Sequence, residues 1–543
     1  MYDEMDQVIS QKTDYDDSTQ ALHINQAFTY TDEGKTKSVK TDSGTETTLK
    51  IDYTYDVKNN KAAASLEDGL FKTGFTYDNA NNLSSIIYSK GSDTALSFSY
   101  LYDKTGNIIK ETNRSGESQY VYDKNDQLLK EVLPNNTTYE YQYDKVGNRT
   151  KLLLNGNETT SYEYQNGNQI VKKNSISFTY DLDGNLLQDD NYKYTYNENG
   201  DQSSVKYLDN KVVAQYEYDE DGLRTKKIIG TKTYEYYYDG EDDNLAIEVT
   251  KENNQIQRYR FYQWDENGKV IGMIIKEKDS SGSWIEKAYY FLTNQRGDVV
   301  SIVDNNGSEV GSYTYSSFGN IISENGTIAK ENFVRYASYY YDTETKHYYL
   351  KARYYDPSNG NFLALDSHPG DDDDPVSQNG YTYAGNSPVL QVDPDGDFFW
   401  MAVNVGFAAY DGYKAYKRGG WKKAAVAVGI GLVGGAAFKA VKSYRLARGA
   451  SRYWYKGTYK SSHASMSDHH ARHVTKFGRS YSQKRYTNMA RAFYRSNKSK
   501  RQPHTLMTGK KGYKVVNGKR GGYYTKSGKI VTYWNNNWRK KRR

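Results

Sequence analysis

The residues of this chain best suited to chemistry are histidines near its C-terminal end. His469, His470 and His473 lie within five residues of one another, beside the densest run of lysine and arginine. On a helix, residues three or four apart are neighbours, so His473 shares a face with both of the others. One imidazole that is neutral near pH 7 can take a proton while a second gives one. With cations to stabilise a charged phosphorus centre, such a pair suits phosphodiester cleavage without a metal or a cofactor.

Other uses of these histidines stay open. They could ligate a metal for DNA hydrolysis, although the tail has one nearby acid, Asp468, and the chain has no cysteine. They could also pack or cap structure only, in a tail that binds nucleic acid or cell wall without catalysis. Asp468 is a plausible N-cap, which predicts a helix that starts at the histidines.

Charge is divided sharply along the chain. From Asp397 to the end there are 34 lysines and arginines against 3 acids, a net charge of +31, whereas the preceding residues carry a net charge of −25. Residues 451–543 hold 25 of these cations and the single acid Asp468. A fold with evenly distributed charge does not give this pattern, so it indicates two modules with different partners, or with each other as partners.

The acidic part consists of repeats. The pattern Tyr-x-Tyr-Asp, or a close variant, recurs at intervals of roughly 20 residues. Its last residues are Asp56, Asp78, Asp103, Asp123, Asp144, Asp181, Asn197, Asp219 and Asp239. Turn sequences such as TGNI at 105–108 and DGNL at 183–186 follow several of them directly.

Each repeat predicts one β-hairpin. Tyrosines two apart lie on one face of a strand, and the aspartate begins a turn in which Gly or Asn takes positive φ. One hairpin is too small to fold alone, so neighbours must stack edge to edge into a continuous sheet. A β-solenoid or a propeller is an alternative that spacing does not exclude.

Residues 289–396 carry a more specific signal. The segments YYFLTNQRGDVVSIVDNNG, YTYSSFGNI, RYYDPSNGNFLALDS and YTYAGNSPVLQVDPDG resemble the core of the rearrangement-hotspot (Rhs) or YD-repeat family. The resemblance covers roughly residues 30–396. It implies a hollow β-shell of spiralling hairpins, closed by the segment from RYYDP to DPDG, with a variable cargo after DPDG.

The same resemblance implies self-cleavage just after the DPDG segment. The matching aspartates are Asp366 and Asp393, which would share a proton, one activating water and the other protonating the amide. This sequence departs from the family pattern after Asp366, where SHPGDDDDP adds the acids Asp371 to Asp374. The alternative is that both aspartates only cap turns.

Residues 397–450 are rich in Gly and Ala with scattered Lys. The apolar run at 424–438 is about 15 residues long, short of the roughly 20 that a spanning helix needs, so no stable membrane span is expected. We interpret this region as a spacer; contact with an anionic membrane is the alternative.

Residues 451–543 resemble RNase toxin domains of the barnase, EndoU, colicin and RelE-like group, through HARH at 470–473, a helix around 486–493 and the strands GYYTKSGKIVTYW. The resemblance implies a catalytic set of four residues, His470, His473, Thr525 and Thr532. The nearest cations in sequence, Arg472, Lys526 and Lys529, are the candidates for binding the nucleic acid and stabilising charge on the phosphorus centre. Wall-associated members of the YD-repeat family in bacilli include tRNA-cleaving toxins, which favours RNA, cut to a 2′,3′-cyclic phosphate.

Taken together, the sequence predicts a mostly β protein, a YD-repeat shell followed by a small basic α+β domain. The expected parts are the shell at 1–288, the core or plug at 289–396, the linker at 397–450 and the nuclease at 451–543. We expect a toxin of competition between bacteria that cleaves RNA, with tRNA the expected target, and that a separate immunity protein neutralises. The N-terminus lacks the apolar segment of a signal peptide. Either the protein acts where it is made, or this chain is the C-terminal piece of a longer exported one. We expect the second, a secreted or wall-associated protein whose toxin acts in the cytoplasm of the target cell.

Overall fold

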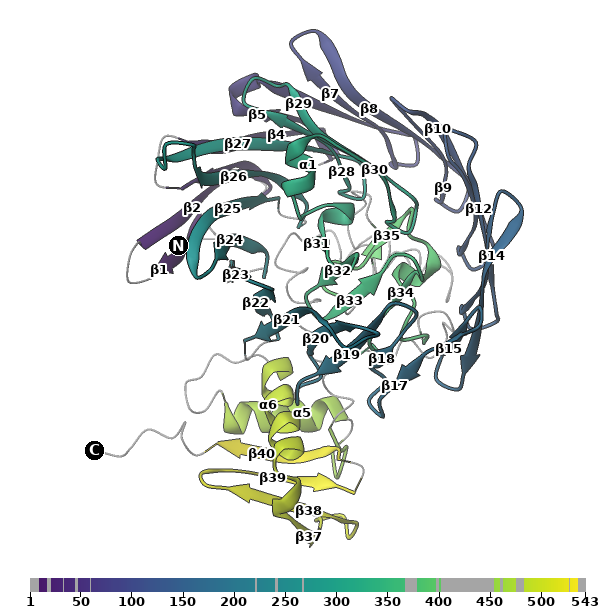
Figure 1. Ribbon diagram of the computed structural model, residues 1–543, viewed down its shortest axis with the longest axis vertical. Coiled ribbons are helices and arrows are strands. Elements are labelled where there is room, and N and C mark those ends of the chain that lie inside the picture. The colour runs from purple at the N-terminus through teal and green to yellow at the C-terminus, as the bar shows by residue number, and fades with distance from the viewer. Residues whose placement is uncertain are drawn as a thin grey trace.

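The computed structural model in Figure 1 describes residues 9–535 apart from 17–20, 33, 44–46, 59, 220–221, 240–242, 266–267, 367–377, 397–399, 402–453, 460–461, 475–482 and 527. The described chain is mostly β. Two large antiparallel sheets follow one another, and within each sheet the strands pair in chain order.

The first sheet runs from β1 to β16. Its strands are β1 (Ser10–Asp16), β2 (Ala21–Tyr30), β3 (Thr36–Asp42), β4 (Thr48–Tyr55), β5 (Lys61–Leu66), β6 (Phe71–Tyr77), β7 (Leu83–Lys90), β8 (Asp93–Tyr102), β9 (Ile108–Asn113), β10 (Gly116–Tyr122), β11 (Leu128–Val132), β12 (Thr138–Tyr143), β13 (Arg149–Leu154), β14 (Asn157–Gln165), β15 (Gln169–Lys173) and β16 (Ile176–Ser177). A 3-10 turn, η1 (Glu67–Gly69), joins β5 to β6.

The second sheet runs from β17 to β30. Its strands are β17 (Thr179–Tyr180), β18 (Leu186–Gln188), β19 (Tyr192–Tyr196), β20 (Gln202–Tyr207), β21 (Val212–Tyr218), β22 (Arg224–Ile229), β23 (Lys232–Tyr238), β24 (Leu245–Glu252), β25 (Gln255–Trp264), β26 (Val270–Lys278), β27 (Trp284–Thr293), β28 (Val299–Asp304), β29 (Glu309–Tyr315) and β30 (Ile321–Asn325).

Two local contacts stabilise the hairpins of the Tyr-x-Tyr-Asp repeats. In most repeats the second tyrosine donates its hydroxyl to a backbone carbonyl of an earlier strand, as Tyr102 does to Leu83 at 2.7 Å and Tyr143 to Leu128 at 2.9 Å. The aspartate closes the turn: Asp103 Oδ1 accepts the amide of Asn107 at 2.9 Å, and Gly106 takes a φ of 89°. The aspartate thereby pairs a turn amide that the sheet ladder leaves unpaired.

A third layer fills the space that the two sheets enclose (Figure 1). It contains helix α1 (Thr327–Glu331), the 3-10 turns η2 (Tyr336–Ser338) and η3 (Ala384–Asn386), and the strands β31 (Tyr340–Asp342), β32 (His347–Leu350), β33 (Arg353–Asp356) and β34 (Asn361–Phe362). A short pair follows, β35 (Gln391–Val392) with β36 (Trp400–Met401). The expected core or plug at 289–396 begins within the second sheet, whose last strand ends at Asn325, so we call only residues 327–396 the plug.

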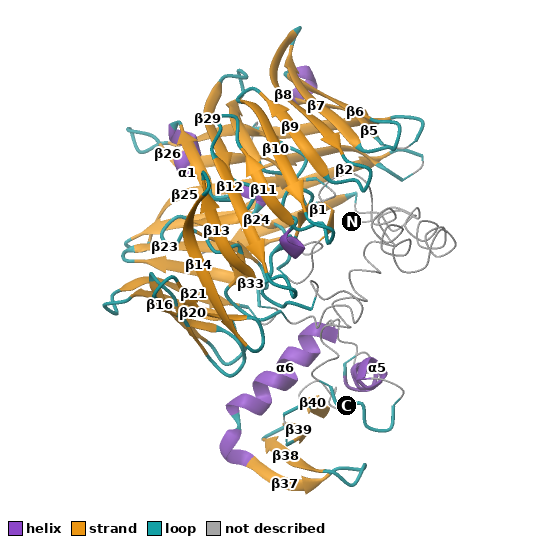
Figure 2. Cartoon of the chain, turned by 90° about the vertical axis from the view of Figure 1, so that its right-hand side faces the viewer, coloured by secondary structure: helices purple, strands orange, loops and turns teal. Residues whose placement is uncertain are grey.

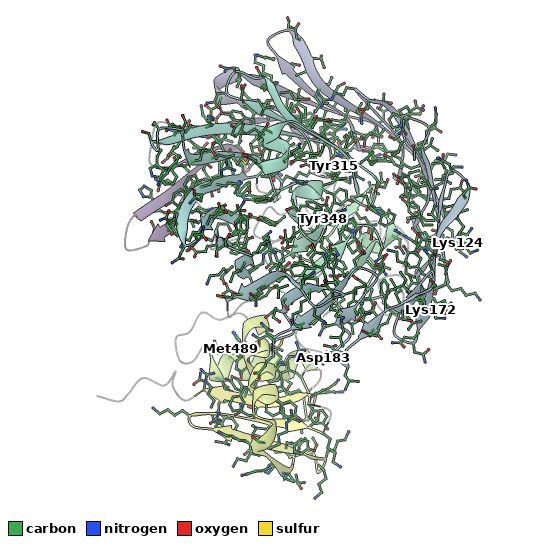
Figure 3. All side chains as sticks on the ribbon, in the orientation of Figure 1. Lys124, Lys172, Asp183, Tyr315, Tyr348 and Met489 are labelled. Atoms are coloured by element: carbon green, nitrogen blue, oxygen red, sulfur yellow. The ribbon has the colours of Figure 1, made fainter. Side chains whose placement is uncertain are left out.

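The plug binds both sheets because its strands alternate. Tyr348 and Tyr355 belong to the core cluster that contains most of the first sheet, whereas Tyr349 and Tyr354 belong to the cluster of the second. Figure 3 shows Tyr348 and Tyr315 inside the curve of the sheets, with Lys124 and Lys172 on the outer surface. Alternate side chains of one strand therefore hold two walls together.

A buried ion network joins the plug to the second sheet. Asp342 of β31 lies 2.6 Å from Arg224 and 2.8 Å from Lys227 of β22, with all three side chains almost fully buried. Burial acts to raise the pKa of Asp342, but the two cations outweigh it and lower the pKa. The carboxylate therefore stays ionised inside the protein.

The C-terminal residues form an α+β unit with a core of its own. We call residues 451–543 the tip. Its elements are α5 (Ser462–His473), α6 (Gln483–Ser496), a 3-10 turn η5 (Lys498–Lys500) and the antiparallel strands β37 (Arg501–Thr505), β38 (Lys511–Asn517), β39 (Arg520–Thr525) and β40 (Ile530–Asn535). Figure 2 shows α6 along one side of this sheet. The prediction of a mostly β shell followed by a small α+β domain is confirmed.

Candidate functional site

Helix α5 brings two imidazoles to the edge strand of the tip's sheet. His469 Nδ1 lies 3.1 Å, and His473 Nε2 lies 3.5 Å, from the hydroxyl oxygen of Thr532 on β40. The two rings are one helical turn apart and stacked, with 5.8 Å between centroids and 6° between planes. We call His469, His473 and Thr532 the imidazole cluster.

His469 is the fixed member of this cluster. It is 9% exposed and stacks on the buried Trp454 at 5.5 Å, and the Trp454 indole N–H donates to Thr487 at 2.8 Å. Burial first, and then the charges of Arg472 and His473, lower the pKa of His469 to about 4. His469 is therefore neutral at pH 7, whereas His473 is more accessible.

Asp468, the single acid of residues 451–543, lies beside the imidazole cluster. Asp468 accepts a hydrogen bond from the Tyr459 hydroxyl at 2.6 Å and pairs with Arg472 one turn later on the helix. The bond from Tyr459 and the charge of Arg472 lower the pKa of Asp468, although its slight burial opposes them. Arg472 also donates to the Tyr459 oxygen at 2.6 Å, which fixes the guanidinium near the imidazoles.

The expectation that Asp468 caps the helix is wrong. Helix α5 begins at Ser462, so Asp468 lies inside it. Its carboxylate pairs with Arg472 and Tyr459 rather than with the first amides of the helix.

The other predicted tip residues lie at different places. The ring of His470 faces the buried Tyr486, with 5.8 Å between centroids. Thr525 lies at the end of β39, where its hydroxyl accepts the amide of Lys529 at 3.0 Å, and Lys526 and Lys529 are exposed in that turn. The structure thus joins His473 and Thr532 and adds His469, which was not a predicted site residue. Its position four residues before His473 was the sequence signal that could have identified His469 as a site residue.

Within the described residues, no group of three or more His, Cys, Asp or Glu side chains is arranged to hold a metal ion. The described helices include none that is both long and apolar enough to cross a membrane. The apolar run at 424–438 lies outside the described residues.

The two aspartates expected to cut the chain meet at one arginine. Arg353 Nη2 lies 2.9 Å from Asp366 Oδ2 and 3.5 Å from Asp393 Oδ2. Nη1 of the same side chain donates to the Gly380 carbonyl at 2.8 Å, and Nε donates to the carbonyl of Gly396. The guanidinium therefore touches both carboxylates and the carbonyl of the bond expected to break.

Arg353 was not predicted from the sequence, although it stands in the quoted segment RYYDP. It is buried against the ring of Phe362, with 3.6 Å to the centroid. Asp371 to Asp374, which could perturb the aspartates, lie outside the described residues.

Comparison with known proteins places the two large sheets and most of the plug in a family. The model of the teneurin YD-shell matches residues 13–389. The tRNA(Glu)-specific nuclease WapA of Bacillus subtilis subsp. natto is 46% identical over 380 residues, which cover 69% of this chain and 16% of that protein. The tRNA nuclease WapA of Bacillus subtilis strain 168 is 39% identical over 287 residues, covering 52% of this chain and 12% of that protein. The chain thus spans less than a fifth of the length of these relatives.

Solved structures agree on the fold. The crystal structure of TcdB2-TccC3-Cdc42 aligns with 73% of this chain and 23% of its own, with a TM-score of 0.60 and 18% identity. At that identity the likeness concerns the fold alone. Since the family model spans most of the chain and the predicted hairpins are those of the structure, the chain belongs to the teneurin YD-shell family.

Proposed function

We propose that the tip is an endoribonuclease toxin that cuts tRNA by metal-independent transesterification. The observation that carries this proposal is the hydroxyl of Thr532 set between His469 Nδ1 and His473 Nε2. Two relatives that share the shell are named tRNA nucleases, which supports RNA as the substrate.

His473 is the general base of this proposal. Its Nδ1 takes the proton of a ribose 2′-hydroxyl while Nε2 faces Thr532, and the 2′-oxygen attacks the adjacent phosphorus. The bond from phosphorus to the 5′-oxygen breaks, and the leaving oxygen takes a proton from His470, a half-buried imidazole three residues before His473 on α5. The products are a 2′,3′-cyclic phosphate and a free 5′-hydroxyl.

His469 and Thr532 position the base. His469 is neutral and held by Trp454, so its Nδ1 gives the Thr532 hydroxyl a fixed partner. With Nδ1 unprotonated, His469 accepts the Thr532 hydroxyl, and Nε2–H of His473 donates to the Thr532 oxygen. This tautomer makes Nδ1 the unprotonated nitrogen of His473. Arg472, Lys526 and Lys529 supply positive charge for the phosphorane-like transition state.

We also propose that the shell releases the tip by cutting itself between Gly396 and Asp397. Asp366 and Asp393 activate water for attack on the Gly396 carbonyl carbon; the C–N bond breaks, and the amine of Asp397 takes a proton. The contact from Arg353 Nε to the Gly396 oxygen supports this assignment, because a cation there stabilises negative charge that develops on that oxygen.

In this proposal the chain is one piece of a longer secreted or wall-associated toxin of competition between bacteria. The tip acts in the cytoplasm of the target cell, and a separate immunity protein protects the producer. The net charge of +31 after residue 396 gives such a partner an obvious surface to neutralise.

One experiment separates the three readings of the tip. The full chain and its His473→Ala variant are expressed inducibly, and total RNA and DNA are run on gels. Fragmented RNA of tRNA size from the wild type alone supports the proposal. Fragmented DNA would favour a metal-dependent DNase, and intact RNA and DNA would favour a tail that only binds nucleic acid or cell wall.

A further inference from the structure

The sheet of the tip has two faces with different neighbours. One face packs on α6: Val515, Tyr524, Ile530 and Tyr533 are fully buried there, and the Tyr524 hydroxyl donates to the Ala490 carbonyl at 2.8 Å. Side chains alternate along a strand, so the residues between these point to the opposite face. We call that opposite side the open face.

One row of the open face leads to the imidazole cluster. The strand register sets Gln502 opposite Lys514, Lys514 opposite Tyr523, and Tyr523 opposite Thr532. Directly paired residues share a face. Tyr523 is therefore the immediate cross-strand neighbour of the threonine whose hydroxyl contacts both histidines.

Three aromatic rings gather around this position. The ring of Tyr523 lies 4.8 Å from that of the exposed His504 and 5.6 Å from that of Trp534, measured between centroids. Trp534 and Thr532 are two apart on β40, so both point to the open face. Val516 of the same face is 43% exposed, so water reaches this side of the sheet. We call His504, Tyr523 and Trp534 the ring platform.

A glycine allows the platform to form. Gly521 pairs with Trp534, and a Cβ built on Gly521 would lie 2.3 Å from Cζ2 of the indole. The indole thus lies directly against the backbone of β39. Any other residue at 521 would push it away.

The charges around the platform favour an anionic ligand. Lys514 stands in the same row as Tyr523, and Asp468 is the single acid among 25 cations in residues 451–543. Aromatic faces interleaved with cations suit bases and phosphates in alternation, which is the chemistry of single-stranded nucleic acid.

We propose that the ring platform is a stacking subsite for an unpaired base next to the scissile phosphate. This inference rests on the proposed function for the position of the cut, but not for the binding itself. A base inside a helix is already stacked on its neighbours, whereas an unpaired base presents a free face. The tip therefore selects unpaired stretches of RNA, such as loops, over helical ones.

The test measures binding of two probes by the full chain carrying His473→Ala, which prevents cleavage. One probe is a labelled, unstructured single-stranded RNA of about ten nucleotides, and the other is the same RNA annealed to its complement. His504→Ala and Tyr523→Leu each remove a ring, whereas Tyr523→Phe keeps it. His504 is exposed, so its loss leaves the fold of the tip intact.

Ring removal should weaken binding of the single strand about tenfold, because stacking one base contributes about 1–3 kcal/mol. Duplex binding should stay unchanged, since phosphate contacts supply it, and Tyr523→Phe should behave as the parent. Equal losses for both probes, or no loss for either, would overturn the subsite. If binding depends on the rings but the wild-type chain cuts no RNA, the nuclease proposal is overturned and the subsite remains.

Discussion

His469 and His473 lie one helical turn apart with nearly parallel rings, 5.8 Å between centroids, and both reach the hydroxyl of Thr532. One ring is buried against Trp454 and the other is accessible. Two chemically identical groups thus have different environments, which is how proteins divide catalytic work between like residues.

Replacing His473 with alanine should abolish RNA cleavage and toxicity while leaving RNA binding largely intact. Removal of a general base costs about 10²- to 10⁴-fold in rate. Gel assays of cleavage and binding assays on one preparation give both values. His463→Ala removes a histidine near the start of α5 and is the matched control. Equal loss of binding and toxicity, with no RNA cleavage by the wild type, would instead favour a binding module.

Acid should destabilise the tip through His469. Its pKa falls from 6.5 to about 4 on folding, so between these values the unfolded chain binds more protons. Stability is thus fully present above pH 6.5 and is lost as the pH falls toward 4, by up to about 3 kcal/mol. Thermal melts at pH 7 and pH 5 should show a smaller acid shift in His469→Gln than in the wild type. Equal shifts in the two proteins would contradict this assignment.

Self-cleavage should stop in Asp366→Asn, in Asp393→Asn and in Arg353→Gln. Each substitution removes a carboxylate or the guanidinium that meets them at Gly396. Mass spectrometry of purified chains reports the intact mass or the two fragments. Asp304→Asn alters an aspartate that only closes a turn, so that variant should still be cut. An uncut wild type would show that Asp366 and Asp393 serve structure alone.

Salt should release the tip from a cleaved shell. The two fragments after cleavage, residues 1–396 and residues 397–543 with the tip, carry net charges of −25 and +31. Salt shortens the screening length of their attraction from about 10 Å at 0.1 M to about 3 Å at 1 M. Gel filtration of cleaved protein at the two concentrations should show joint elution at low salt and separate elution at high salt. If the two fragments elute together at both salt concentrations, electrostatic attraction does not hold them together.

Asp342→Asn should destabilise the shell by about 3–5 kcal/mol, because it leaves Arg224 and Lys227 buried without their shared carboxylate. Denaturant unfolding measures the loss. The matched control is Asp209→Asn, which breaks an exposed pair with Lys211 and should leave the unfolding midpoint unchanged. A similar unfolding midpoint for both variants would show that the buried ion network contributes little to the stability of the shell.

The repeats could be predicted from sequence because their causes are local. Tyr102, Asp103 and Gly106 act between neighbouring strands, so their spacing already specifies the turn. The imidazole cluster could be predicted only in part. Whether His469 or His470 joins His473 depends on where β40 places Thr532, and that follows from packing of α5 against a strand far along the chain. Arg353 could not be predicted as a site residue for the same reason, since Gly396 and Asp393 reach it only when the plug folds.

The alternating tyrosines of β32 and β33 have a consequence for the order of events during synthesis. The two large sheets are synthesised first. The plug tyrosines that pack against them, near residue 350, leave the ribosome later. Domains fold as units while the chain is still emerging. The cationic tip is therefore translated only after the residues that complete the interior of the shell, so the shell can close before the tip folds.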